Sequence, residues 1–114
     1  MPTIQVFGKS KCFDTKKAER FFKERKVKVQ LIDLPRYGIS RGELQSVIKA
    51  IGGIDALLNV KHPDIATVQY LAHDDDKIEA LLDEPSMLQT PIVRCGKSAS
   101  IGVQVEKWGA MIDA

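Results

Sequence analysis

A strand–helix–strand pattern opens the chain and constrains its fold more than any other feature of the sequence. Residues 3–7 form a β-branched and aromatic run, which is typical of a short buried strand. In residues 13–26, apolar residues at i, i+3 and i+4 lie among charged ones and predict an amphipathic helix. Residues 27–34 begin with period-two alternation and predict a second strand. This order implies two parallel strands joined by a right-handed crossover.

The middle of the chain predicts helices. Residues 35–39 are expected to form a loop. Ser40 and Glu43 then have the spacing of a capping box ahead of apolar residues, so a helix starts there and ends at Gly52-Gly53. Three shorter helical patterns follow, over residues 54–59, 64–71 and 75–82.

The last third of the chain predicts a β-hairpin and a closing helix. Residues 92–95 and 98–103 are two strand-like runs, and the turn that joins them contains Gly96. Residues 105–112 have a helical pattern, with Trp108 on the side that is expected to pack against the sheet.

The order of these patterns predicts an α/β fold. The sequence β-α-β, a helical stretch and then β-β-α gives a four-stranded mixed sheet, because the hairpin adds antiparallel strands to a parallel pair. A chain of 114 residues is long enough to bury a core without metals or disulfides. We expect one domain over residues 1–114, with a helical insertion over about residues 40–84.

Composition and charge argue against several classes of function. Lys and Arg number 17 against 15 Asp and Glu and are interspersed with them, which gives dedicated nucleic-acid binding little support. The sequence contains no apolar signal segment and no apolar run of membrane length, so we expect a cytoplasmic protein with no membrane contact. Two distant cysteines and no Cys/His cluster at zinc spacing predict neither a disulfide framework nor a bound metal.

Cys12 is the candidate nucleophile, because it lies between the first predicted strand and the first predicted helix. Backbone N–H groups and the positive end of the helix dipole can stabilise a thiolate there, whereas the carboxylate of Asp14 opposes it. Nearby lysines also favour the thiolate: Lys9, Lys11, Lys16 and Lys17. A free cysteine is often simply a small buried hydrophobe, but residues in a loop ahead of a helix are generally exposed.

Thr15 follows Cys12 by one helical turn, so its hydroxyl is expected on the same face. It could donate a hydrogen bond to the thiolate or serve only as a helix cap, and both roles stay open. Because residue 15 is not a second cysteine, any disulfide formed at Cys12 needs an external thiol such as glutathione, or another cysteine of the chain. Cys95 is the one internal candidate, and a packing role in its strand is expected for it instead.

Several motifs resemble the arsenate reductase (ArsC)/Spx family of the thioredoxin-like superfamily. They are the run at residues 12–18, Ser40-x-x-Glu43-Leu44, the long segment at residues 78–93 and Gly102-Val103. The resemblance covers essentially the whole chain and implies a thioredoxin-like fold. It also implies a cis peptide before Pro91, with this proline beside the cysteine, where it shapes the backbone that receives a thiol-bearing partner.

The chain departs from this family where arsenate reductases carry arginines around the cysteine. One such position follows a Leu-Leu pair and is Asn59 here, and a second precedes the cis-proline and is Thr90 here. A third, in the second strand of the hairpin, falls within residues 100–103, which contain no arginine. Arginine binds oxyanions as a bidentate, always-charged donor, and lysine does not reproduce that geometry. We therefore do not expect arsenate reduction.

The resemblance and the residues together predict a thiol-dependent oxidoreductase linked to glutathione. Cys12 would attack a disulfide and Thr15 would stabilise its thiolate. Glutathione, or a protein thiol or disulfide, is the expected partner, with glutathione as co-substrate and no bound cofactor. The residues expected to bind the substrate are Lys9, Lys11, Lys16, Thr90 and Pro91. A threonine before the proline is similar to thioredoxins and glutaredoxins, which favours sulfur as the target.

Two other functions stay open. Residues 53–58, a glycine followed by an acidic residue and an aliphatic pair, resemble the surface with which Spx-type regulators contact RNA polymerase. A glycine pair between helices is also a simple stop signal, and the Cys-x-x-Cys switch of those regulators is missing. The other possibility is a domain that keeps the fold without catalytic activity.

Overall fold

A computed structural model describes residues 3–113 and shows a single four-stranded sheet among them. The strands are β1 (Ile4–Gly8), β2 (Val29–Asp33), β3 (Ile92–Cys95) and β4 (Ser98–Ile101). Their order in the sheet is β2-β1-β3-β4, with β1 parallel to β2 and β3 antiparallel to β1 and β4. The α/β fold with a mixed sheet that the sequence predicts is confirmed.

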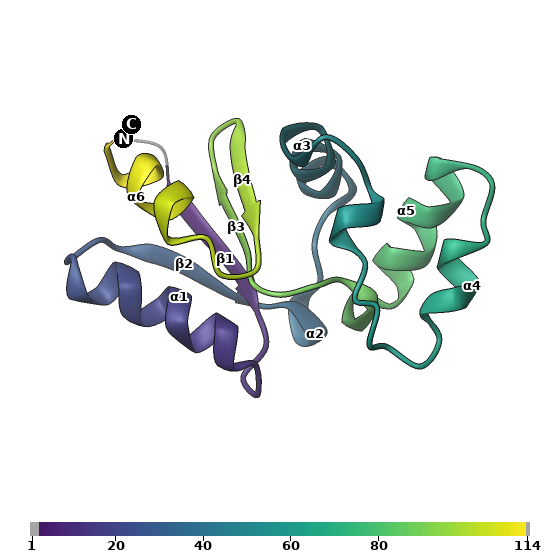
Figure 1. Ribbon diagram of the computed structural model, residues 1–114, viewed down its shortest axis with the longest axis horizontal. Coiled ribbons are helices and arrows are strands. Elements are labelled where there is room, and N and C mark those ends of the chain that lie inside the picture. Colours follow the sequence, from purple (N-terminus) through teal and green to yellow (C-terminus); the bar gives the residue numbers. More distant parts are fainter. Residues whose placement is uncertain (1–2, 114) are drawn as a thin grey trace.

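Helices cover both faces of this sheet. They are α1 (Phe13–Glu24), α2 (Leu34–Tyr37), α3 (Arg41–Ile51), α4 (Ile65–Gln69), α5 (Asp74–Asp83) and α6 (Val105–Asp113), with short 3-10 helices η1 (Asp55–Leu57) and η2 (Pro85–Met87). Helices α1 and α6 lie on one side of the sheet, while α3 lies on the other with α4 and α5 farther out (Figure 1). None of the helices in residues 3–113 is both long and apolar enough to cross a lipid bilayer.

The α1–α6 side of the sheet is built on an aromatic cluster. The rings of Phe21 and Phe22 meet edge to face at 5.2 Å, and both lie within 6.0 Å of the Trp108 ring. Trp108 also donates a hydrogen bond from Nε1 to Ser100 Oγ, 3.1 Å away on β4. These contacts fix the closing helix against the sheet, as the sequence predicts for Trp108.

The opposite face of the sheet forms the larger core, which joins the sheet to the helical insertion. Phe7 of β1 and Ile92 of β3 pack there with Leu44 and Val47 of α3, all fully buried. The same cluster extends through η1, α4 and α5. The insertion is therefore held by a continuous apolar core.

Several predicted boundaries differ from those in the structure, and three of the differences have a local reason. Residues 35–39 were expected to be a loop, but α2 forms there because Pro35 occupies the first helical turn, where it is tolerated. Helix α1 ends at Glu24 rather than residue 26, since Lys26 has a φ of 58° and leaves the helical region. Strand β4 ends at Ile101 because Gly102 has a φ of 71°.

Candidate functional site

Cys12 is the N-cap residue of α1. Its φ and ψ of −93° and 116° are extended, and its carbonyl accepts a hydrogen bond from the Lys16 N–H at 3.2 Å, which begins the helix. The Cys12 N–H donates to the Lys9 carbonyl at 3.1 Å and closes a tight turn after β1. The thiol therefore lies at a helix N-terminus. Its side chain is half-buried and stays accessible.

The segment before β3 brings Thr90 to the Cys12 sulfur. The Thr90–Pro91 peptide bond is cis, as the resemblance implies, and both residues are buried. The Thr90 hydroxyl donates a hydrogen bond to Cys12 Sγ at 3.2 Å, and the Thr90 carbonyl oxygen lies 3.9 Å from the same sulfur. A backbone bond from the Gln89 N–H to the Leu57 carbonyl, at 2.8 Å, ties this segment to the insertion.

Thr15 lies in the first turn of α1 and is buried, with 4% of its surface exposed. Its Oγ1 accepts a hydrogen bond from the Lys9 N–H at 3.3 Å. A hydroxyl has one proton to donate besides its acceptor lone pairs, so this arrangement leaves the Thr15 proton available to the sulfur.

The surroundings of Cys12 lower the pKa of its thiol. Burial acts in the opposite direction and raises the pKa, since it disfavours the charged form. Hydrogen bonds from the side chains of Thr15 and Thr90, together with the backbone of Thr15 and Asp14, stabilise the thiolate and outweigh burial. The net effect is a more acidic thiol than a free cysteine, and the thiolate is the nucleophilic form.

The thiol opens into a hollow of about 360 Å³ between the start of α1 and the insertion. Three segments line it: Lys9, Lys11, Cys12 and Asp14 from the first turn, residues 58–61 from the insertion, and Gln89 with Thr90. The Lys9 ammonium donates to the Ser86 carbonyl at 3.2 Å, whereas Lys11 is exposed. Two segments thus bring lysines to the hollow, because Lys61 of the insertion lines it together with Lys9 and Lys11 of the first turn.

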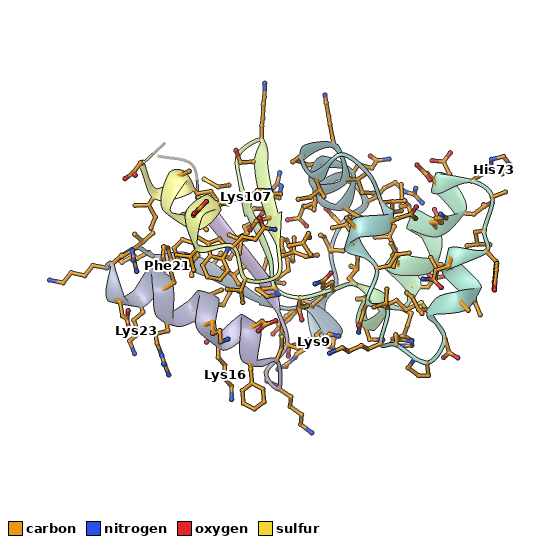
Figure 2. All side chains as sticks on the ribbon, viewed as in Figure 1. Lys9, Lys16, Phe21, Lys23, His73 and Lys107 are labelled. Atoms are coloured by element: carbon orange, nitrogen blue, oxygen red, sulfur yellow. The ribbon has the colours of Figure 1, made fainter. Side chains whose placement is uncertain are left out.

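Most of the predicted site residues come together here, but Lys16 does not. Cys12, Thr15 and the Thr90–Pro91 segment adjoin one another, and Lys9 and Lys11 line the hollow. Lys16 is exposed on α1, with its Nζ 5.9 Å from the centre of the Phe13 ring, and does not line the hollow. Figure 2 shows Lys16 projecting from α1, whereas Lys9 lies near the insertion.

Two contributions to this site were not predicted. The sequence indicated a role for the backbone of Thr90, but the Thr90 hydroxyl contacts the sulfur directly. Lys61 and Gln89 were not among the predicted site residues, and both line the hollow. The contact of the Thr90 hydroxyl had one signal in the sequence, a polar side chain beside the expected cis-proline. The positions of Lys61 and Gln89 depend on how the insertion folds over the end of the sheet.

The three positions where the family's arsenate reductases are expected to carry arginine hold other residues in this chain. Asn59 lines the hollow and accepts a hydrogen bond from the Lys61 N–H on Oδ1 at 3.2 Å. Ser100 is fully buried and occupied by its bond with Trp108. Arg94 is near these positions in the sequence, but its side chain donates a hydrogen bond to Gln5 Oε1 of β1 at 2.6 Å. Among the residues that line the hollow there is no arginine.

Cys95 packs in a core, as expected, and lies far from Cys12. It is 5% exposed within the cluster that contains Phe22 and Trp108. Cys95 pairs with Ile4 at one end of β1, whereas the turn that carries Cys12 leaves from the Gly8 end, about 13 Å away along the strand. A disulfide needs Cα atoms within about 7 Å, so Cys95 cannot resolve a disulfide at Cys12 in this fold.

Two further kinds of site were considered in the sequence: a metal site and a surface that contacts RNA polymerase. Within residues 3–113, no three His, Cys, Asp or Glu side chains group so that they could hold a metal. In the segment at residues 53–58, the side chains of Ile54, Leu57 and Leu58 are buried, so mainly Asp55 and Ala56 face solvent. Contact of this segment with RNA polymerase stays a prediction.

Comparisons with known proteins agree on one family and one fold. The family model for the ArsC family matches residues 7–111. Among solved structures, the YffB (PA3664) protein is 26% identical with a TM-score of 0.80, covering 96% of this chain and 98% of its own. An arsenate reductase from Vibrio cholerae is 18% identical with a TM-score of 0.85, at the same coverages. No match was found among curated proteins. The thioredoxin-like fold predicted from the sequence is confirmed.

Proposed function

This chain belongs to the ArsC family, and we propose that it is a glutathione-dependent thiol–disulfide oxidoreductase with Cys12 as its nucleophile. Family membership supports a thiol-dependent oxidoreductase-like function. The role of Cys12 as the nucleophile is supported by one observation. Its half-buried thiol has a pKa lowered by hydrogen bonds and opens into a hollow lined by lysines.

The first step transfers a glutathionyl group to the protein. The Cys12 thiolate attacks the glutathione sulfur of a mixed disulfide, so a new S–S bond forms at Cys12 as the old one breaks. The released thiolate takes a proton from water. The hydrogen bonds that lower the pKa of Cys12 increase the fraction of this thiol that is deprotonated at a given pH.

The second step requires an external thiol. A glutathione thiolate attacks the sulfur of the bound glutathione, which forms glutathione disulfide and releases the Cys12 thiolate. No internal cysteine can take this role, because Thr15 replaces the second cysteine of a Cys-x-x-Cys motif and Cys95 is buried at the far end of β1. The stabilised thiolate is also a better leaving group, since a thiol of lower pKa leaves faster.

Substrate binding would combine backbone contacts with charge. The proposed site pairs the peptide of glutathione with the backbone at Thr90, beside Pro91, while Lys9, Lys11 and Lys61 attract its two carboxylates. Lys16 would contribute only long-range attraction, because it lies outside the hollow. No arginine lines the hollow to bind an oxyanion as a bidentate donor, so arsenate is disfavoured as a substrate.

The test measures the rate at which the mixed disulfide of glutathione and 2-mercaptoethanol is reduced in the presence of glutathione. We expect the wild-type protein to accelerate this reduction and Cys12→Ser to give the uncatalysed rate. Cys95→Ala serves as the matched control and should retain the activity, since Cys95 lies outside the site. Arsenate in place of the mixed disulfide should not be reduced. A wild-type rate equal to the uncatalysed one, or equal activity of Cys12→Ser, contradicts the proposal.

A further inference from the structure

Gly8 is the last residue of β1 and lies directly under the side chain of Thr15. A Cβ atom built on Gly8 would be 2.2 Å from Thr15 Cγ2, 2.7 Å from Thr15 Oγ1 and 3.0 Å from Thr15 Cβ. These distances are below ordinary van der Waals contact. The Thr15 side chain therefore occupies the space that any other residue at position 8 would fill.

The backbone of Gly8 does not itself require glycine. Gly8 continues the β-ladder, paired with Asp33, and is not among the glycines with positive φ, unlike Gly38 and Gly102. An L-residue could adopt its conformation without strain. Position 8 has no room for a Cβ atom, because the Thr15 side chain lies too close.

Thr15 is held on two sides by the end of β1. The missing Cβ of Gly8 lets the first turn of α1 approach the strand, and the next residue, Lys9, donates its N–H to Thr15 Oγ1 at 3.3 Å. With its acceptor so engaged, the Thr15 hydroxyl is left to donate toward Cys12, and its hydrogen bond is one of those that lower the pKa of the thiol.

We infer that Gly8 is a positioning residue for the Cys12 thiolate, acting through Thr15 by leaving room for its side chain. Gly8 touches neither the sulfur nor a substrate in this scheme. A methyl group at position 8 would push Thr15, and with it the first turn of α1, away from the strand. This inference rests on the proposed roles of Cys12 and Thr15.

The test measures alkylation of Cys12 by iodoacetamide as a function of pH, with peptide mass spectrometry to separate Cys12 from Cys95. For Gly8→Ala we expect a higher Cys12 pKa and an alkylation rate near pH 7 that is about tenfold lower, equivalent to about 1.4 kcal/mol. Gly109→Ala is the matched control, because a Cβ there meets nothing within 4 Å, and should leave the profile unchanged.

A double-mutant cycle separates positioning from general damage. Thr15→Ala removes the two atoms nearest to position 8, so adding Gly8→Ala to it should change the Cys12 profile little. Should Gly8→Ala alone fold poorly, Thr15→Ala is expected to restore its thermal unfolding midpoint. Fully additive effects, no restoration of folding, or an unchanged profile in Gly8→Ala would overturn the inference. An ordinary Cys12 pKa in the wild-type protein would instead contradict the proposed function.

Discussion

The Cys12 sulfur lies between two threonines from distant parts of the chain. Thr15 comes from the first turn of α1, and Thr90 comes from the segment that leads into β3. Each supplies a hydroxyl that favours the charged form of the thiol, while burial of the sulfur opposes it. Thr15 could be foreseen from its spacing of three residues, because contacts within one helical turn are local. The Thr90 hydroxyl could not, since 78 residues separate it from Cys12.

Replacing the Thr90 hydroxyl should make the thiol less reactive. Thr90→Val keeps the shape of the side chain but removes the donor that lies 3.2 Å from Cys12 Sγ. We expect the Cys12 pKa to rise and its alkylation rate at pH 7 to fall about tenfold, because a hydrogen bond to a charged group is worth roughly 1.5–3 kcal/mol. Thr3→Val, at an exposed position, is the control. An unchanged alkylation profile in Thr90→Val would show that this hydrogen bond does not stabilise the thiolate.

At the scale of elements, the helices with strong local signals agree best with the sequence. Helix α3 begins where the capping box predicts, with the Ser40 side chain accepting from the Glu43 N–H and the Glu43 carboxylate accepting from the Ser40 N–H. Helix α2 lies where a loop was predicted, and Pro35 was the only local signal there. Proline is common both in turns and in the first turn of a helix. Local chemistry could not decide between the two.

The same capping box predicts a pH-dependent contribution to stability. Burial raises the pKa of Glu43, but hydrogen bonds with Ser40 and Gln5 and the charge of Arg94 lower it by more. A carboxyl whose pKa is depressed by folding stabilises the protein above its unfolded pKa, about 4.3 for glutamate, and this stabilisation is lost as the pH falls through the folded value. In Glu43→Gln, which keeps the capping geometry, we expect a smaller loss of stability between pH 5 and 3 than in the wild type.

Thermal or urea unfolding across this pH range measures the effect. Glu24→Gln is the comparison, since Glu24 lies exposed at the end of α1 and is not part of the capping box. Parallel stability curves for the wild type and Glu43→Gln from pH 7 to pH 3 would contradict the assignment.

For the whole molecule, the hollow beside Cys12 forms where the sheet meets the insertion. Its walls come from the turn after β1, from residues 58–61 and from the segment before β3. Hydrophobic periodicity predicts strands and helices because it is a local property, and their order then limits the topology. It cannot predict which lysines reach the hollow: Lys16 is close to Cys12 in sequence but lies outside, whereas Lys61 lines it.

The pH dependence of Cys12 alkylation in the wild-type protein shows whether this fold stabilises the Cys12 thiolate. We expect a midpoint for iodoacetamide modification of Cys12 below that of an ordinary cysteine, about 8.5. A midpoint at or above that value would contradict it, because Cys12 would then be mostly protonated at neutral pH.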